Sequence, residues 1–322
     1  MARFLGRDDR RVLSGIDSFA SLFDPDLARF KHPVLVLKME EPGSKQLLAF
    51  KHNEIRNICQ DTINHLVNDV IVMGAKPLAV LDVIICGKLD RRIVLKIVKG
   101  LSEACEKQDC TLVGGETSEQ PRVLASGTYV LAASALGVVE REKIIDGSRI
   151  IAGDAILALA SNGLHTNGFS LIRKLIEERP AISRRKIGKH RFIDEVLRVH
   201  RSYKNDLEAL FGDNNLHGLA HITGGGIEAN LARILPRRVD ATIRLDRLRI
   251  PPIFKVIREE GDVSDSEMLR VFNMGIGMIL VCKNAAKGKF RRHLTSRHCE
   301  SYPIGDVTRG TGIVRFQEKI RW

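Results

Sequence analysis

The chain has few aromatic residues and lacks the cysteine patterns that hold metal ions or disulfide frameworks. Only 5% of its 322 residues are Phe, Trp or Tyr, so the sequence predicts hydrophobic cores built from Leu, Ile and Val. Its 6 cysteines include no CxxC pair, which argues against a zinc site. Most of them lie in apolar surroundings and indicate the reduced thiols of a cytosolic protein.

Long apolar runs are also missing. No run reaches the roughly 20 residues that cross a bilayer, and the N-terminal stretch lacks the apolar core of a signal peptide. We therefore expect a soluble, cytoplasmic protein with no membrane partner. The GxSxG pattern of a nucleophilic serine is absent as well, so the sequence does not support serine catalysis.

Negative charge is in deficit, since the formal net charge is +12 and the pI is about 9.6. This balance favours an anionic partner: a phosphorylated metabolite, a nucleotide or a nucleic acid. The basic residues are dispersed, with local clusters at 184–186, 237–238 and 287–292. Few aromatic side chains accompany them as a single-strand nucleic-acid surface requires, so the simplest interpretation is a solvated basic surface.

Strand and helix patterns alternate regularly along the first half. Short apolar runs at 34–37, 78–85, 111–113 and 129–139 predict strands, and apolar residues at helical spacing predict helices at 55–74 and 92–108. This order favours a mixed α/β sheet with helices on one face.

The strand pattern restarts after Asp146-Gly147-Ser148, so we expect two domains, at 1–148 and 149–322. In the second domain the pattern predicts strands at 156–159 and 278–281. It also predicts helices at 170–178, 205–211 and 227–233.

Two glycine-rich runs, Gly163 to Gly168 and Gly224 to Gly226, precede predicted helices. Each has a histidine and a hydroxyl nearby, which is typical of a chain that brings bare backbone amides against an anion. His165 and His221 are candidates for acid–base work or phosphate contact, because the imidazole pKa lies near neutrality.

Acidic residues gather in the first half, where Asn68-Asp69 and Glu116 lie close to apolar runs. Carboxylates in such positions can hold Mg²⁺ while the metal bridges nucleotide phosphates. Lys45, in Pro42-Gly43-Ser44-Lys45, resembles a phosphate-contacting lysine on a turn, although no full Walker pattern surrounds it.

Taken together, the motifs resemble the aminoimidazole ribonucleotide synthetase family, also called phosphoribosylformylglycinamidine cyclo-ligase. The similarity runs from about Ser21 to the region of Val281. It is carried by Asn68 to Leu78, Leu81-Asp82, Gly87 to Asp90, Gly114 to Thr117, Gly163 to Ser170, His221 to Gly226 and Phe272 to Gly277.

This resemblance implies a two-domain α/β subunit, in which residues 1–148 bind ATP and dimerise and residues 149–322 contribute the site for the substrate phosphate. The N-terminal sheets of a homodimer are expected to form a shared β-barrel, with ATP and Mg²⁺ nearby. The implied reaction closes the imidazole ring of a phosphorylated ribonucleotide in purine biosynthesis. In that reaction ATP phosphorylates an amide oxygen, and a nitrogen of the substrate then displaces the phosphate.

The resemblance also implies roles for individual residues. Catalytic roles fall to His165, Asn167 and Lys45, and metal binding falls to Asp69, Glu116 and Glu40. Nucleotide binding falls to Asn68, Asp69, Glu116, Lys45, Gly114 and Gly115. Substrate binding falls to His165, Thr166, Asn167, Ser170, His221, Thr223, Gly224, Gly225 and Gly226, with Asn273 as a further candidate.

Departures from the family pattern concentrate on the nucleotide side. Glu40 and Glu41 replace an aspartate and a glycine of a nucleotide loop, and Ser14-Gly15-Ile16-Asp17 is what remains of an N-terminal segment. The sequence also departs from the usual family motifs at Tyr129 to Ala133 and at Gln120-Pro121-Arg122.

These departures leave an alternative open: a catalytically inactive homologue that serves as a structural or binding subunit, with RNA as a partner of its basic surface. A related ATP-using enzyme, such as a selenophosphate synthetase or a thiamine-phosphate kinase, fits the wording of Phe272 to Gly277 and His221 to Gly226 less well.

Overall fold

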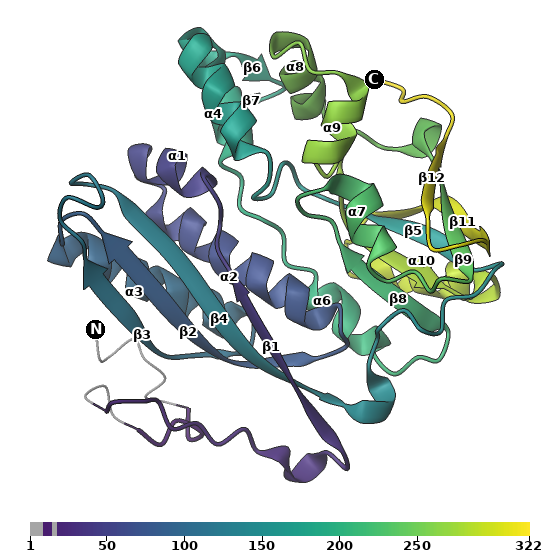
Figure 1. The fold of residues 1–322 in the computed structure, drawn as a ribbon, viewed down its shortest axis with the longest axis horizontal. Coiled ribbons are helices and arrows are strands. Elements are labelled where there is room, and N and C mark those ends of the chain that lie inside the picture. Colours follow the sequence, from purple (N-terminus) through teal and green to yellow (C-terminus); the bar gives the residue numbers. More distant parts are fainter. Residues whose placement is uncertain (1–8, 15–17) are drawn as a thin grey trace. The chain divides into compact units, whose positions relative to one another are not determined.

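The computed structural model describes residues 9–14 and 18–322, and its contacts divide the chain into two units, Met1–Ile144 and Ile145–Trp322 (Figure 1). The segment Ser14 to Asp17 therefore falls largely outside the described residues. No helix in the described part of the chain is both long and apolar enough to cross a membrane. The division of ATP and substrate binding between two domains stays a prediction.

The first unit is a four-stranded mixed sheet in the order β1-β4-β2-β3. The neighbours β2 and β3 are parallel, and the other two pairs are antiparallel. A helix connects the parallel pair, as a crossover connection requires. The elements are β1 (Pro33–Glu40), α1 (Lys45–Lys51), α2 (Ile55–Ile71), β2 (Lys76–Cys86), α3 (Arg91–Lys107), β3 (Thr111–Glu119) and β4 (Tyr129–Glu140).

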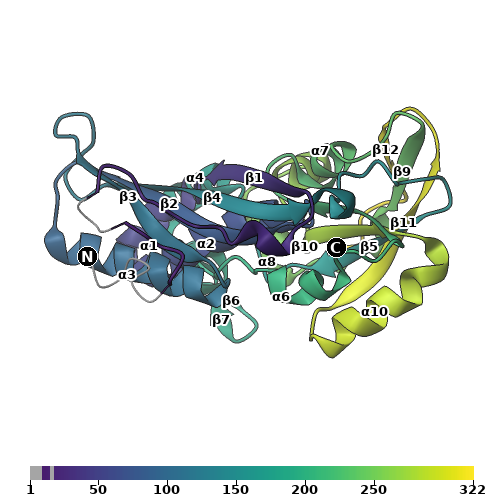
Figure 2. The same ribbon diagram turned by 90° about the horizontal axis from the view of Figure 1, so that it is seen from below.

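The helices of this unit cover one face of its sheet, which confirms the expected arrangement (Figures 1 and 2). Along β1, residues with more exposed side chains alternate with less exposed ones, because successive side chains of a strand point to opposite faces. The exposed set is apolar: Leu37 and Met39 are 78% and 65% exposed, and Leu81 on β2 lies on the same open surface. The second face therefore presents an apolar surface that no described helix of this unit covers, although residues 18–21 and Phe23 line part of it.

The second unit is built on a six-stranded sheet in the order β12-β9-β11-β5-β10-β8. Its strands are β5 (Ala155–Ala160), β8 (Leu216–His221), β9 (Val239–Arg244), β10 (Ile276–Cys282), β11 (Ser301–Arg309) and β12 (Val314–Gln317), with a small hairpin of β6 (Lys186–Ile187) and β7 (His190–Arg191). Its helices are α4 (Phe169–Glu178), α5 (Phe192–Val196), α6 (Lys204–Leu207), α7 (Gly226–Ala232), α8 (Pro252–Glu260), α9 (Asp265–Val271) and α10 (Lys287–Ser296). The helix predicted at 205–211 is shorter than expected, since α6 continues only as a 3₁₀ turn over Glu208–Leu210.

The position of β10 brings the functional loops together. Because β10 pairs in antiparallel fashion with both β5 and β8, those two strands run parallel to each other. The loops that follow β5 and β8 therefore leave the sheet at the same edge, where β10 begins. Both predicted glycine runs lie in these loops.

Candidate functional site

Two glycine loops of the second unit meet at the edge of its sheet. A Cβ atom built on Gly224 would lie 3.4 Å from Oδ1 of Asn167, so the side chain of one loop rests beside the backbone of the other. The structure thus brings together residues that are more than fifty positions apart in the sequence. The family resemblance assigns both loops to one substrate, and that shared role stays a prediction.

The first loop is held in a strained conformation by Asn273. Its amide nitrogen donates to the carbonyl of Gly163 (2.9 Å), and its Oδ1 accepts from the amide of Gly275 (2.9 Å) and from the hydroxyl of Ser161 (3.2 Å). His165 has a φ of 60°, a left-handed conformation that costs a non-glycine residue about 1–2 kcal/mol. Such strain persists where surrounding contacts enforce it, and it is common at ligand sites.

The second loop is organised by Asn230 of α7. Its amide nitrogen donates to the carbonyls of Gly226 (2.8 Å), Gly224 (3.2 Å) and Thr223 (3.3 Å), and its Oδ1 accepts from the hydroxyl of Thr223 (3.2 Å). With its carbonyls tied inward, the loop can direct amides outward. The amide of Gly226 closes a turn onto Thr223, whereas within residues 18–322 those of Gly224 and Gly225 have no protein acceptor.

Three buried histidines lie together at this site: His165 in the first loop, His221 at the end of β8, and His200 before α6. The ring of His200 stacks on that of His165 with centroids 4.0 Å apart, and its Nε2 lies 3.0 Å from Nε2 of His221. The hydroxyl of Thr166 lies 3.3 Å from Nδ1 of His200. Predicted substrate residues from the first loop and from the end of β8 thus share one neighbour, His200.

The same three histidines present a possible metal-binding set, because their ligand nitrogens lie within 4.8 Å of one another. The planes of His165 and His200 are inclined by only 19°, however. The in-plane lone pairs of two stacked rings lie in separate, nearly parallel planes, and one ion cannot lie in both planes. We therefore assign the cluster to stacking and hydrogen bonding.

In the first unit, Glu40 and Asp69 converge on a single cation. The ammonium of Lys38 lies 2.9 Å from Glu40 and 3.0 Å from Asp69. Burial alone lowers the pKa of Lys38, but hydrogen bonds to the two carboxylates outweigh it and the net pKa is raised. Two predicted metal ligands are thus brought together, and both pair with Lys38.

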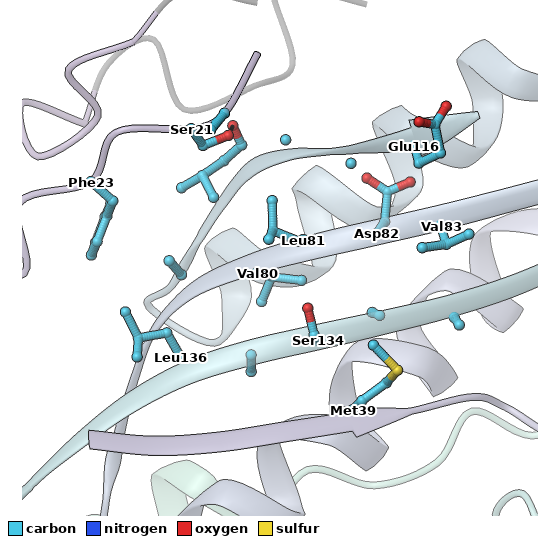
Figure 3. A pocket seen from close by; sticks show the side chains of 18 of the residues that line it. Ser21, Phe23, Met39, Val80, Leu81, Asp82, Val83, Glu116, Ser134 and Leu136 are labelled. Carbon is cyan, nitrogen blue, oxygen red and sulfur yellow. Dashed lines mark hydrogen bonds between the residues drawn. The ribbon is translucent and has the colours of Figure 1, made fainter. Parts of the chain in front are cut away.

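Glu116 does not join this pair. Glu40 lies on β1 and Glu116 on β3, the two edge strands of the sheet, which are about 14 Å apart at the usual strand spacing of ~4.8 Å. Glu116 instead lines a pocket of about 920 Å³ on the uncovered face, beside Asp82 on the neighbouring strand (Figure 3). Burial raises the pKa of Asp82 to about 7.

Gly114 and Gly115 lie inside β3 and leave room for neighbouring side chains. A Cβ on Gly115 would lie 2.2 Å from Oδ1 of Asp82, and one on Gly114 would lie 2.5 Å from the hydroxyl of Ser21. Ser21 donates that hydroxyl to the carbonyl of Val113 (2.8 Å). Gly115 therefore allows close approach within the sheet and Gly114 allows close approach of the segment that contains Ser21, and their predicted role in nucleotide binding stays a prediction.

The predicted setting of Lys45 is wrong. It is the first residue of α1, not a turn residue, and its ammonium is fully buried at 2.8 Å from Asp61 of α2. Burial lowers the pKa of Lys45 despite the attraction of that carboxylate. The ion pair ties two helices together, and a role in catalysis or nucleotide binding stays a prediction.

Sequence reasoning missed Lys38, His200 and Asn230. None of them lies in a glycine run or a family motif, so no local pattern marks it. Only the pairing of β5, β8 and β10 and the packing of α2 on β1 bring them to the candidate sites. Asn68 and Asn273 were identified in advance, and both are buried.

Both units match domains of a known protein family. Residues 27–139 match the N-terminal domain of AIR synthase related proteins, and residues 152–317 match the C-terminal domain of the same family. These ranges contain both glycine loops, the Glu40–Lys38–Asp69 cluster and all three buried histidines.

The chain is also similar to curated enzymes over most of its length. It is 41% identical over 297 residues to the phosphoribosylformylglycinamidine cyclo-ligase of Cupriavidus metallidurans, covering 92% of this chain and 84% of that protein. It is 42% identical, with the same coverage, to the enzyme of that name from Burkholderia lata.

Solved structures share the fold at low sequence identity. Thiamine-monophosphate kinase from Stenotrophomonas maltophilia superposes with a TM-score of 0.71 and 17% identity, over 96% of this chain and 92% of that one. Hydrogenase maturation protein HypE, solved in complex with ATP, gives a TM-score of 0.66 and 17% identity over 93% and 84% of the two chains. These likenesses show the fold alone.

Proposed function

The chain belongs to the AIR synthase related family, and from that premise we propose how its residues close an imidazole ring with ATP. The protein is an ATP-dependent cyclo-ligase that converts formylglycinamidine ribonucleotide to aminoimidazole ribonucleotide in purine biosynthesis. Nothing in the relatives favours the alternative of an inactive subunit. The likeness to thiamine-monophosphate kinase extends to the fold only, because identity there is 17%.

The observation that carries the site assignment is the meeting of the two glycine loops above the histidines. We infer that the outward amides of Gly224 and Gly225 receive the phosphate of the ribonucleotide, because backbone amides in a glycine loop form an anion-binding concavity. Asn167 lies at that point and is suited to hold the ribonucleotide in place. Positioning of this kind supplies much of the rate in phosphoryl transfer.

The reaction has two steps, phosphoryl transfer and ring closure. The terminal phosphoryl group of ATP passes to the amide oxygen of the substrate, which leaves ADP. A nitrogen of the substrate then attacks the carbon that bears this phosphorylated oxygen. The new C–N bond closes the ring, and the C–O bond breaks to release inorganic phosphate. The chain contributes orientation of the substrate through His165, Thr166 and Asn167, whose loop is fixed by Asn273.

ATP and Mg²⁺ are assigned to the first unit. The oxygen ligands of Glu40 and Asp69 fit Mg²⁺, and they already converge on a cation, Lys38. A bound Mg²⁺ would neutralise phosphate charge during transfer. HypE, which shares the fold, was solved with ATP, and this supports a nucleotide role for the fold.

A homodimer fits the uncovered apolar face of the first sheet. Leu35, Leu37, Met39 and Leu81 are all exposed there, and an apolar surface of this kind marks an interface. We propose that this face packs against its counterpart in a second copy, as the family resemblance implies.

A direct assay tests the function. Purified protein with ATP, Mg²⁺ and formylglycinamidine ribonucleotide should form ADP and the aminoimidazole product in equal amounts. Absence of ADP above a blank without ribonucleotide, together with no measurable ATP binding, would refute the proposal.

The site assignment has its own test. His165→Ala should raise KM for the ribonucleotide much more than KM for ATP, because His165 belongs to the loop assigned to the substrate. An equal rise in both constants would contradict that assignment.

A further inference from the structure

His200 stands out because it contacts two segments of the candidate site without belonging to either: His165 and Thr166 of the first glycine loop, and His221 at the end of β8, the strand that leads into the second loop. It precedes α6, and its side chain is fully buried at 0% exposure. One face of its ring stacks on His165, and its two nitrogens face His221 and Thr166. All three neighbours were assigned to the substrate above, whereas His200 has no access to solvent.

On the premise of the proposed function, we propose that His200 is a positioning residue that orients the rings of His165 and His221 for the phosphorylated substrate. It acts through these neighbours and does not touch the substrate itself. The contacts with His165, Thr166 and His221 lie in the second unit, to which the ribonucleotide was assigned, so the proposal concerns binding of the ribonucleotide and not of ATP.

The hydrogen bond between His200 and His221 has a strict requirement. Two imidazole nitrogens 3.0 Å apart form a bond only if one carries a hydrogen and the other accepts it. The tautomer of His221 is therefore tied to that of His200, and through Nδ1 to the hydroxyl of Thr166. Loss of His200 removes this hydrogen bond from a buried nitrogen of His221, and with it the constraint that the bond places on the tautomer of that ring.

The stack on His165 has a separate effect. His165 holds a left-handed backbone conformation, and Gly277 lies directly under its ring, where a Cβ would be 2.5 Å from Cε1. The ring of His165 is confined, because the backbone of β10 lies close to it and the ring of His200 stacks on it. The contact thus fixes a side chain that emerges from a strained loop.

Three substitutions separate these contacts. His200→Gln places an amide near the position of Nε2 and can keep the bond to His221 without the stack. His200→Asn places its amide near Nδ1 and can keep only the contact with Thr166. His200→Phe keeps a flat ring on His165 and loses both polar contacts.

His217→Asn is the matched control, because His217 is a buried histidine of the same unit that pairs with Asp154 at 2.6 Å, outside the three-histidine cluster.

Steady-state kinetics give the first readout. His200→Asn and His200→Phe should raise KM for formylglycinamidine ribonucleotide about ten-fold, the value of one buried hydrogen bond, with KM for ATP unchanged. His200→Gln should stay within about three-fold of the wild type, since it keeps the 3.0 Å bond to His221 and loses only the stack and the longer, 3.3 Å contact with Thr166. The control variant, His217→Asn, should lower thermal stability and leave KM for the ribonucleotide and KM for ATP unchanged. If all three His200 variants behave like the control, the proposal is wrong.

A second readout does not depend on catalysis. In ¹⁵N-labelled full-length protein without ligands, the ring nitrogen shifts of His221 should report one tautomer in the wild type and in His200→Gln. They should move toward an averaged value in His200→Asn. Unchanged His221 shifts in His200→Asn would overturn the inference even in an active enzyme. An inactive wild type with the expected shifts would instead overturn the proposed function alone.

Discussion

Asp82 places a carboxyl group in the interior of β2, and the contribution of this group to the stability of the fold depends on pH. Burial raises its pKa from 3.8 to about 7, so the folded protein holds this proton more tightly than the unfolded chain does. The group therefore stabilises the fold below about pH 4, and this stabilisation is lost as the pH rises through about 7.

Asp82→Asn should remove this dependence. We expect the variant to match the wild type near pH 4 and to exceed its free energy of unfolding at pH 8 by up to ~4 kcal/mol, at about 1.4 kcal/mol per pKa unit. Urea unfolding at both pH values measures the difference, with Glu116→Gln on the neighbouring strand as the control. A constant offset between Asp82→Asn and the wild type at all pH values would contradict the argument.

Gly226 combines a positive φ with a crowded position. Its φ is 65°, and a Cβ there would lie 1.8 Å from the backbone oxygen of Leu269. Gly188 has a φ of 59° and no atom within 4 Å of the same position, so it isolates the backbone cost from the clash.

Gly188→Ala should cost about 1 kcal/mol of unfolding free energy, whereas Gly226→Ala should cost ~3 kcal/mol or more. Urea denaturation of both variants gives the comparison. Equal losses would mean that crowding at Gly226 is unimportant.

Between elements, Lys38 of β1 holds Asp69 of α2 and Glu40 of its own strand. Lys38→Met should leave two neighbouring carboxylates that repel each other, and Mg²⁺ should relieve that repulsion. We expect Tm of the variant to fall in EDTA and to recover with Mg²⁺ by more than the wild type changes. Lys76→Met, which breaks a more exposed pair with Asp109, is the control. The interpretation fails if Mg²⁺ shifts both variants equally.

Most of the secondary structure was predictable because its apolar periodicity is local. The strands at 78–85 and 129–139 and the helices at 55–74 and 92–108 match β2, β4, α2 and α3 closely. The glycine loops were predictable too, since glycine runs beside a histidine form a local pattern. The strand at 111–113 proved longer, because β3 continues through Gly114 and Gly115, which sequence propensity disfavours in a strand.

The missed parts are non-local. Lys45 looked like a loop residue because Pro42 and Gly43 precede it, yet tertiary packing commits it to Asp61. Lys38 meets Asp69 only because α2 packs on β1, and His200 meets His165 and His221 only because the second unit folds its loop against them. Single-sequence patterns do not encode such contacts. Their roles are therefore visible only in the assembled units.

For the whole molecule, the uncovered sheet face predicts the oligomeric state. Leu37→Asp should place a charge in the proposed dimer interface and shift the protein to monomers, since an unpaired buried charge is costly. Sedimentation velocity measures the change. Ile313→Asp, at an exposed apolar residue of the second unit, should leave the dimer intact. A Leu37→Asp protein that remains dimeric would show that another surface mediates association.

The strand order of the first sheet also bears on biosynthesis. β1 pairs only with β4, from Pro33 opposite Glu140 to Glu40 opposite Ala133, so its partner is translated last among the four strands. At about 5–20 residues per second, β1 waits roughly 5–20 s on the ribosome with an unpaired edge and a row of apolar side chains. During that interval the nascent chain is a substrate for chaperones, and slow codons between β1 and β4 would lengthen its exposure to aggregation.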